Sequence, residues 1–523
     1  MKKLLIPFLL CCFSNAYAQT QDLIALAKGE FLGMNALYDE NEDLFGYISI
    51  YNYGKTSEKT KKFEYVILDK NLNPFANNTF EGDITAGDYY GYISFDGSVI
   101  LRPSRLDASH VKPKDMFTPS SMIIDLKTNT IKRKVYYDFD HGNFKEVVEN
   151  NTWRENRKER KAERKENGFV YYSTVSEIKE GGYLAHAYDY KDAHPGEKSL
   201  MRYDEDKKLM WTYKYNPDPT KAKWQVLYYL EKDEKYFFAL LRDYVEKGSN
   251  TSYGIQSGAN SIPDKFYLLV LDMKTGKEVH KKEIPDPDGI MQDIMSFPTY
   301  SYSNLDNDKS FDDKIVMVGR AGVRTYKSGV SRLLIDRETF DVDLKALYYK
   351  DDFKEHIPHI KANGGVGKGY YLNPRDIFFM KDGSVGMLYE KYKPETEYTA
   401  VKTSDMIYIY FDKDFNIKGT RLFEKEKSKW RHSDYLFSQN LNDGNDLVFF
   451  YRDYEKDDEA KDKNWNLYIN TLIGGKFNQE VIPISSTDDY MIYPYIAREG
   501  YIMLNEFNRK AKYNKIRLER LNY

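Results

Sequence analysis

Few residue clusters in this sequence have the types and spacing that chemistry needs. Residues 364–369 (GGVGKG) look like a phosphate-binding loop, but Ala362 stands where the leading glycine belongs, and Gly369 replaces the serine or threonine that would hold magnesium. Residues 355–359 (EHIPH) differ from a zinc-binding H-E-x-x-H helix, because the acid precedes the first histidine and Pro358 interrupts the helix. No G-x-S-x-G nucleophile elbow occurs. Because none of these motifs is complete, the sequence indicates no catalytic residue, and a non-enzymatic protein is favoured.

Two oxygen-rich turns are weak candidates for calcium. One places oxygen side chains at Asp39, Asn41 and Asp43, and the other at Asp306 and Asp308. Both lack the glycine at the sixth position and the acid at the twelfth position of an EF-type loop. Ordinary polar hairpin turns are therefore the preferred interpretation. We expect no cofactor and no metal ion, with calcium as the one ion that these turns would allow.

The first eighteen residues predict export. Two lysines precede an apolar run at residues 4–13, and residues 16–18 (AYA) form a small-x-small cleavage site, a pattern typical of a removed secretory signal peptide. Both cysteines, Cys11 and Cys12, lie inside this segment, so the mature chain would have no thiol for a disulfide, a zinc site or a nucleophile. A lipoprotein would need a small residue before the cysteine, where Leu10 stands.

The composition favours β-strands and argues against nucleic-acid binding. The 523 residues carry a net charge of -3, so the chain offers no basic excess to displace phosphate counterions. The 47 tyrosines and 29 phenylalanines belong to the residue types that fit pleated, half-buried surfaces. Composition therefore predicts an all-β fold.

Two kinds of hairpin alternate along the chain. The first kind turns at an acidic residue followed by glycine, which takes the positive φ of a tight hairpin; examples are Asp96-Gly97, Asp382-Gly383, Asp443-Gly444 and Glu499-Gly500. The second kind has a turn that begins at residues 69, 125, 204, 272, 336, 412 and 474, a spacing of 56 to 79 residues. Two hairpins per period predict a β-propeller of four-stranded blades. Eight copies of the first kind favour eight blades, and seven is the alternative because the copy at 292–319 is irregular.

A polar residue followed by an aromatic one ends the second strand of many first-kind hairpins. The pairs are Asn52-Tyr53, Asp189-Tyr190, Asp243-Tyr244, Lys391-Tyr392, Asp453-Tyr454 and Glu506-Phe507. We expect these aromatic residues to lie on one rim of the ring. Packing between blades is the first interpretation of the rings, and a binding surface is the second. The candidate binding residues are Tyr190, Tyr244, Tyr392 and Tyr454.

The repeats predict one domain over residues 19–523. The last blade is a strand short, and the apolar stretch at residues 23–32 is expected to complete it from the other terminus. Residues 153–166 interrupt the pattern with seven Arg or Lys and four Glu at helical spacing. A solvated helix or insertion is the preferred interpretation, and a docking arm for an acidic partner is the alternative.

Four features together characterise the whole sequence: the leader, strands rich in Tyr, Lys and Asn, the absence of cysteine from the mature chain, and the propeller spacing. In these features the chain resembles exported β-propeller-like proteins of Bacteroidota. The resemblance implies the periplasm or the exterior of a Gram-negative bacterium. It carries no functional residues, because WD-type and kelch-type signatures are missing.

Three classes of function stay open, and the least favoured is an outer-membrane barrel, because Arg517 and Glu519 would fall on its lipid-facing side. A binding or scaffolding module for a glycan, peptide or protein partner is preferred, because a propeller offers large loop-lined faces. The alternative is a glycan-active hydrolase or lyase on the same scaffold, suggested by export and by abundant aromatic and carboxylate side chains. Neither a nucleic acid nor a membrane span is expected.

Overall fold

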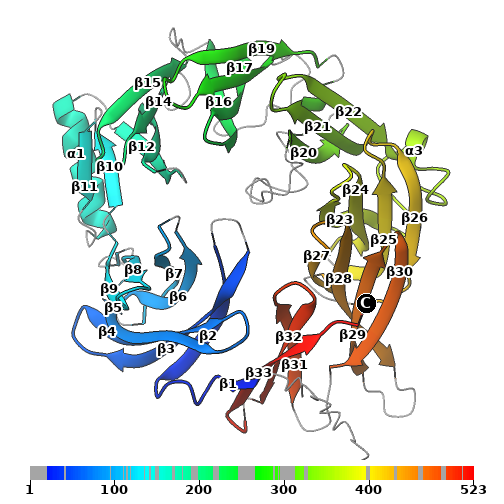
Figure 1. Ribbon diagram of the computed structural model, residues 1–523, viewed down its shortest axis with the longest axis horizontal. Coiled ribbons are helices and arrows are strands. Elements are labelled where there is room, and N and C mark those ends of the chain that lie inside the picture. Colours follow the sequence, from blue (N-terminus) through cyan, green and yellow to red (C-terminus); the bar gives the residue numbers. More distant parts are fainter. Residues whose placement is uncertain are drawn as a thin grey trace, which may run out of the picture.

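The computed structural model shows an all-β ring of antiparallel sheets (Figure 1). The structure describes residues 20–522 apart from residues 40–42, 95, 110, 113–115, 118, 135, 141–142, 148–151, 168–170, 179–180, 190–197, 216–222, 246–264, 287–288, 292–293, 295–312, 323–327, 396–400, 429–432, 457–462, 485–489 and 509. The predicted signal peptide lies outside the described residues. Within them, eight blade sheets surround the centre, which is consistent with the expected eight blades.

Successive segments of the chain build successive blades, numbered here along the sequence. Blade 1 is β2 (Glu30–Tyr38), β3 (Leu44–Lys55), β4 (Thr60–Asp69) and β5 (Pro74–Asp83), and blade 2 is β6 (Ala86–Ile93), β7 (Val99–Leu106), β8 (Met122–Asp125) and β9 (Thr130–Arg133). Blade 3 is β12 (Tyr171–Glu177), β13 (Tyr183–Asp189), β14 (Lys198–Tyr203) and β15 (Leu209–Tyr215), and blade 4 is β16 (Lys223–Lys232), β17 (Tyr236–Val245), β18 (Phe266–Asp272) and β19 (Glu278–Ile284). Each sheet orders its strands as they occur in the chain, so the β-propeller fold is shown.

The second half of the ring repeats this arrangement. Blade 5 has three described strands, β20 (Lys314–Ala321), β21 (Gly329–Asp336) and β22 (Val342–Tyr348), and is followed by the short helix α3 (Tyr349–Asp352). Blade 6 is β23 (Tyr371–Phe379), β24 (Val385–Lys393), β25 (Lys402–Phe411) and β26 (Ile417–Phe423). Blade 7 is β27 (Tyr435–Leu441), β28 (Asp446–Lys456), β29 (Lys463–Ile473) and β30 (Lys476–Pro483).

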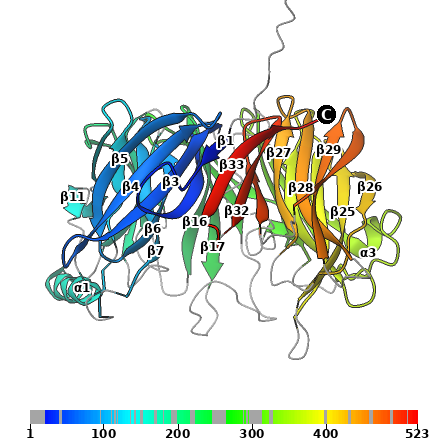
Figure 2. The same cartoon turned by 90° about the horizontal axis from the view of Figure 1, so that it is seen from below.

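The two ends of the chain meet in blade 8. Its strands are β31 (Met491–Ile496), β32 (Tyr501–Asn508), β33 (Tyr513–Arg520) and, from the other terminus, β1 (Thr20–Asp22), which pairs antiparallel with β33 (Figure 2). We expected the closing strand within residues 23–32, and the structure places it just before them, at Thr20–Asp22. Leu23 is buried and continues the pairing with a backbone hydrogen bond to Asn514, whereas Glu30–Tyr38 belongs to blade 1.

The repeated turn residues cap the hairpins. At the predicted first-kind turns, Gly97, Gly383, Gly444 and Gly500 all have φ between 76° and 85°, as such turns require. At the second-kind turns, an aspartate accepts hydrogen bonds from backbone N–H groups two to four residues later. Asp69, Asp125, Asp204, Asp272, Asp336 and Asp412 all do so. The aspartates that recur along the sequence therefore have a structural role, because they stabilise the hairpin turns.

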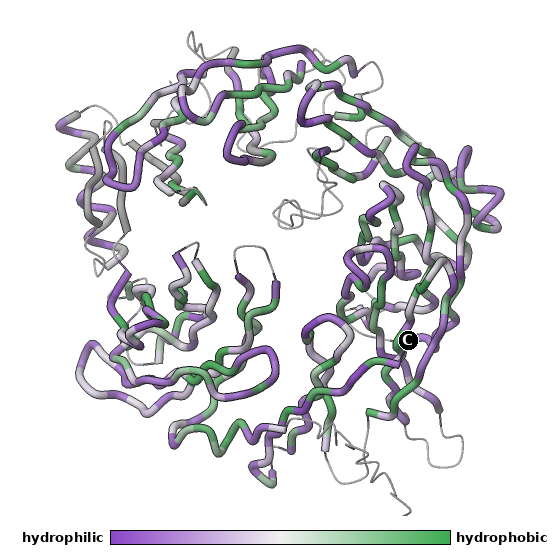
Figure 3. The backbone as a smooth tube through the Cα atoms, in the orientation of Figure 1, coloured by the Kyte–Doolittle hydropathy of each residue, from purple (hydrophilic) through white to green (hydrophobic). Residues whose placement is uncertain are grey.

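Hydrophobic residues pack between neighbouring blades. Shared clusters join blades 1 and 2, 3 and 4, 4 and 5, 5 and 6, 6 and 7, 7 and 8, and 8 and 1. Outer strands such as β26 and β30 are largely exposed, and Figure 3 shows hydrophilic residues along this outer side of the ring. All blades except blades 2 and 3, which share no such cluster among the described residues, are therefore packed against a neighbour on both faces.

An insertion lies between blades 2 and 3. The hairpin of β10 (Tyr136–Asp140) and β11 (Asn143–Val147) contacts β12, and helix α1 (Trp153–Asn167) follows it (Figure 1). Thr152 and Glu155 form a capping box at the start of α1, because the Thr152 N–H donates to Glu155 and the Glu155 N–H donates to the Thr152 hydroxyl. The described side chains of α1 are exposed, which fits the solvated helix that we expected. No described helix is long and apolar enough to cross a membrane.

Candidate functional site

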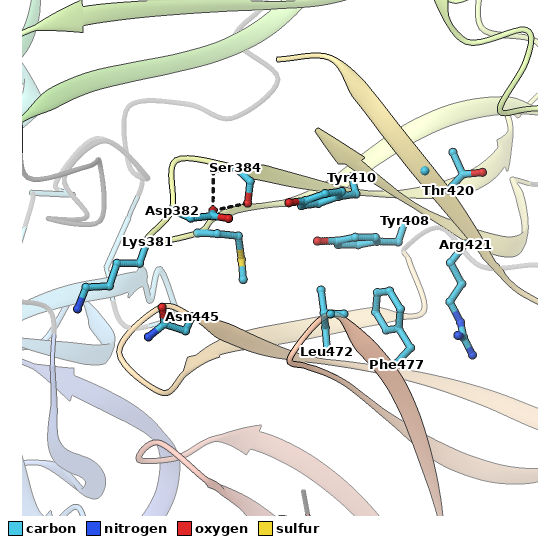
Figure 4. Close-up of a pocket in the computed structure, with 13 residues that line it drawn as sticks. Lys381, Asp382, Ser384, Tyr408, Tyr410, Thr420, Arg421, Asn445, Leu472 and Phe477 are labelled. Carbon is cyan, nitrogen blue, oxygen red and sulfur yellow. Dashed lines mark hydrogen bonds between the residues drawn. The ribbon is translucent and has the colours of Figure 1, made fainter. Parts of the chain in front are cut away.

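A cavity of about 560 Å³ lies between blades 6 and 7. It is at the face of the ring that carries the first-kind and second-kind hairpin turns, here called the turn face. Its walls come from the turn at residues 380–384, from β25 and β26 of blade 6, and from the two hairpin turns of blade 7 (Figure 4). Rigid antiparallel strands therefore position most of its side chains.

Two glycines explain why blade 6 leaves space here. Gly386 in β24 and Gly419 in β26 lie on either side of Tyr410, which is opposite both in the sheet. A Cβ atom on Gly419 would meet no other atom within 4 Å, so this glycine opens the cavity. A Cβ atom on Gly386 would instead collide with the hydroxyl of Tyr408. One glycine therefore leaves the cavity empty, and the other makes room for a tyrosine.

Aromatic rings form one wall of the cavity. The ring centroids of Tyr408 and Phe477 are 5.1 Å apart at an interplanar angle of 74°, and those of Phe423 and Phe477 are 5.4 Å apart at 76°. Both arrangements are edge-to-face, a favoured geometry for aromatic pairs. The guanidinium carbon of Arg421 lies 5.1 Å from the Phe477 centroid and 5.5 Å from that of Phe423. These rings hold the cation at the margin of the cavity.

Polar groups line the end nearest the first-kind turns. Asp382 accepts hydrogen bonds from the backbone N–H of Ser384 at 2.9 Å and from its hydroxyl at 2.5 Å. Lys381 forms an ion pair with Asp443 in the corresponding turn of blade 7, and its backbone N–H donates to Gly444 at 3.1 Å. Figure 4 shows the hydroxyls of Tyr408 and Tyr410 pointing toward this end, away from Arg421. The cavity thus has a hydroxyl end and a cationic end.

The hydroxyl of Tyr408 is an unusual group in this wall. The residue is 2% exposed, and its oxygen is buried with no hydrogen-bond partner among the described residues. Burial, together with the nearby Tyr410 and Asp382, raises the pKa of this phenol well above its usual value. Tyr408 therefore stays protonated and presents a hydrogen-bond donor that the protein does not satisfy.

The opposite end of the same interface contains a buried ion cluster, formed by Arg375, Glu390, Lys425 and Asp434. The Lys425 ammonium is 2.6 Å from Asp434 and 3.8 Å from Glu390, and all three side chains are at most 1% exposed. Arg375 pairs with Glu390 at 2.7 Å. The cluster joins the end of β24 to the segment that crosses into β27, at the face that we call the crossing face.

The predicted binding tyrosines lie near this crossing face. Tyr244, Tyr392 and Tyr454 all belong to the second strand of their blades. Tyr392 is half-buried and pairs with Tyr371 of β23. Tyr454 is 4% exposed, its hydroxyl donates to the Lys427 carbonyl at 2.6 Å, and its ring is 5.1 Å from that of Trp465 in the next strand of the same blade. Tyr190 lies outside the described residues.

The calcium candidates are only partly described. Asp39 and Asp43 close the hairpin between β2 and β3, where the Asp43 N–H donates to the Asp39 carboxylate at 3.0 Å. Asn41, Asp306 and Asp308 lie outside the described residues. Within the described part of the chain, no three His, Cys, Asp or Glu side chains gather as a metal site would require.

The glycine-rich motif forms turns before β23. Gly364, Gly367 and Gly369 all have positive φ, and the backbone N–H of Lys361 donates to the Gly365 carbonyl at 2.8 Å. The carbonyl of His356 accepts a hydrogen bond from Thr420 at 2.9 Å, which ties this segment to β26. These contacts give the two motifs a structural role beside blade 6.

Sequence reasoning did not find the cavity. Its residues come from four strands and three turns of two blades. The strongest local signal is the pair of glycines, Gly386 and Gly419, in the strands β24 and β26, because glycine in a strand marks a close approach or an open space. That signal does not say which blade faces would meet.

No protein family and no curated protein matches the sequence. Solved structures with a similar arrangement include the β-propeller domain of the Trilobed protease from Pyrococcus furiosus, with 8% identity and a TM-score of 0.30 over 88% of this chain and 99% of that one. The WD40 domain of SCAP from fission yeast has 8% identity and a TM-score of 0.33, covering 96% and 94%. Prolyl oligopeptidase B from Galerina marginata has 10% identity and a TM-score of 0.34, covering 93% of this chain and 57% of that one. Because these TM-scores are low, the β-propeller assignment is based on the ring of sheets in this structure and not on these similarities.

Proposed function

We propose that this chain is an exported binding or scaffolding module that holds a glycan, peptide or protein partner at the cavity between blades 6 and 7. The observation that carries the proposal is the cavity itself. Small-molecule and cofactor sites are usually concave, about 300–1,000 Å³ in volume, and apolar with a few placed polar groups. The cavity has this size, an aromatic wall and polar groups at both ends.

Export supports the same proposal. The leader pattern before residue 19 predicts that the mature chain is exported to the periplasm or the exterior of a Gram-negative cell, where glycans and peptides are available. A propeller positions the cavity on rigid strands, so binding there would require little ordering of the protein.

Filling the cavity tests the proposal. Gly419→Leu places a side chain in open space, so we expect the protein to fold normally and to lose binding to the ligands that the wild-type protein retains on glycan and peptide arrays. Lys418→Leu is the matched control, because Lys418 is the preceding residue of β26 and does not line the cavity. Equal binding by wild type and by Gly419→Leu would contradict the proposal.

The same arrays, followed by product analysis, test the hydrolase or lyase alternative. Glycosidases usually need two carboxylates across the bound sugar, and Asp382 is the one carboxylate among the described residues that line the cavity. We expect no release of sugar fragments by the wild-type protein. Release that is lost in Asp382→Asn would show that the cavity is an active site instead.

A further inference from the structure

Arg421 is held in place but its charge is not balanced. The guanidinium stacks on Phe423 and Phe477, and within the described part of the chain no carboxylate lies within 4.0 Å of it. Lys418, three residues earlier in the same strand, pairs with Asp412 at 3.0 Å. Because stacking leaves the planar edge of the guanidinium available, Arg421 can receive an anionic oxygen pair from a ligand.

The second observation is independent of charge. Tyr408 lies directly opposite Arg421 in the β25–β26 pair, and Tyr410, two residues later in β25, shares that face of the sheet and lines the cavity. The Tyr408 hydroxyl is buried against Gly386, whereas Tyr410 is partly exposed. In Figure 4 the Tyr410 hydroxyl and the Arg421 guanidinium point to opposite ends. One ligand that contacts both groups must therefore present a hydrogen-bonding group at one end and an anion at the other.

The groups around the Tyr410 hydroxyl indicate which kind of ligand the cavity fits. The Tyr410 hydroxyl, the Asn445 amide and the Asp382 carboxylate line the same end of the cavity, and together they offer both donors and acceptors. Hydroxyl groups match such a mixture because each can donate and accept. The apolar wall of Met380, Leu472 and Phe477 suits the C–H face of a ring. An acidic peptide side chain would satisfy Arg421 but brings no set of hydroxyls.

We propose that the cavity binds a sugar unit that carries a carboxylate, with the carboxylate on Arg421 and the ring hydroxyls at Tyr410, Asp382 and Asn445. This inference rests on the proposed function and names the ligand class of that same cavity. It makes the chain a receptor for uronic-acid glycans rather than for neutral glycans.

The test compares acidic and neutral forms of the same sugars. Trimers of galacturonate, glucuronate and mannuronate are titrated against the purified protein by calorimetry, each beside its methyl ester. We expect at least one acid trimer to bind on the order of tenfold or more tightly than its ester, because a hydrogen bond between charged groups is worth at least that factor. An acidic peptide of similar charge serves as the third arm and should bind more weakly than the sugar.

Two variants with the same change of charge locate the effect. Arg421→Gln should remove the preference for the acid while leaving ester binding unchanged, and Lys418→Gln should leave both unchanged. Tyr410→Phe should weaken acid and ester alike, since it removes a hydroxyl that lines the cavity, and Tyr408→Phe should leave both unchanged, since its hydroxyl is buried. Circular dichroism of each variant verifies the fold.

The outcomes separate this inference from the proposed function. Binding of a neutral glycan that Gly419→Leu abolishes and Arg421→Gln does not affect would overturn the inference and keep the binding module. Tighter binding of the acidic peptide, or no binding of any acid trimer, would also overturn the inference. Sugar binding that is unaffected by Gly419→Leu would overturn both.

Discussion

The two ends of the interface between blades 6 and 7 are built in opposite ways. At the crossing face, Lys425 lies between the carboxylates of Asp434 and Glu390 with no exposed surface. At the turn face, Gly386 and Gly419 remove side chains from the sheet, and the space that Gly419 leaves stays open. Between these ends, the same hydrophobic cluster joins both blades. One interface thus contains a buried ion cluster at one end and a cavity at the other.

A propeller can leave a cavity at one end of an interface when the other end of that interface is firmly packed. Blades are joined only through their faces, so an interface must be secured somewhere if the ring is to stay closed. Three buried charges and their hydrogen-bonding partners fix the geometry at one end, because a mispaired buried charge is costly. The other end can then omit side chains and present a site. This division of roles leads to four predictions, from the largest expected effect to the smallest.

Removing the central cation of the ion cluster should have the largest effect. Lys425→Met leaves two buried carboxylates facing each other, and loss of one partner from a buried ion pair costs about 3–5 kcal/mol. We expect the free energy of unfolding, measured by urea denaturation, to fall by this amount. Lys381→Met removes a lysine from the exposed pair with Asp443 at the turn face and should change stability little. Similar losses in both variants would show that the two ends do not differ.

The two glycines should respond oppositely to the same small change. Gly386→Ala places a Cβ atom against the Tyr408 hydroxyl, so we expect a loss of about 1–3 kcal/mol from overpacking. Gly419→Ala meets open space and should be neutral or slightly stabilising, within about 0.5 kcal/mol. Thermal unfolding of both variants beside wild type measures the difference. Equal destabilisation would mean that the cavity at Gly419 is closed in solution.

The buried carboxyl of Asp376 should make the interface sensitive to pH. Burial raises the pKa of Asp376, which accepts hydrogen bonds from Tyr435 and Ser438 across the interface. Above about pH 4 the unfolded chain ionises this group while the folded chain keeps its proton, so stability falls as the pH rises toward the raised pKa. We expect Asp376→Asn to remove this decline, which is at most about 1.4 kcal/mol per pH unit. Urea midpoints between pH 4 and pH 7 measure it.

Asp125 gives a control of opposite sign for the pH measurement. Hydrogen bonds from Thr128 and Lys127 lower the pKa of its carboxyl, so its contribution to stability is present above the ordinary pKa and is lost as the pH falls. Asp125→Asn should therefore flatten the acid side of the profile. A flattening on the same side in both variants would contradict the assignment of Asp376.

The smallest effect should come from the candidate tyrosine at the crossing face. Tyr454→Phe removes the hydrogen bond to the Lys427 carbonyl and keeps the ring against Trp465, so we expect a loss of about 1 kcal/mol. Tyr392→Phe is the matched change in the preceding blade and should be close to neutral, since Tyr392 is half-buried. A change in ligand binding in Tyr454→Phe without any change in stability would favour the binding interpretation of this position.

The architecture could be predicted because its signals are local. Glycine φ at Gly97, Gly383, Gly444 and Gly500 and the side-chain caps at the repeated aspartates depend on residues within one turn, and their spacing gave the blades. The closing strand was misplaced by a few residues because Thr20–Asp22 is too short to show alternation. The cavity could not be predicted, since Gly419 and Phe477 meet only when two blades face each other.

The amino-acid sequence alone was enough to predict the β class, the two hairpins per blade and the polar–aromatic ends of the second strands, because each depends on a short pattern of residue types. The charges that are buried together at Lys425, the tyrosine hydroxyl that lacks a partner and the glycine that opens a cavity depend on the tertiary structure. These properties arise between strands that are far apart in the chain, and burial there changes the free energy of a charge or a hydroxyl far more than its neighbours in sequence do.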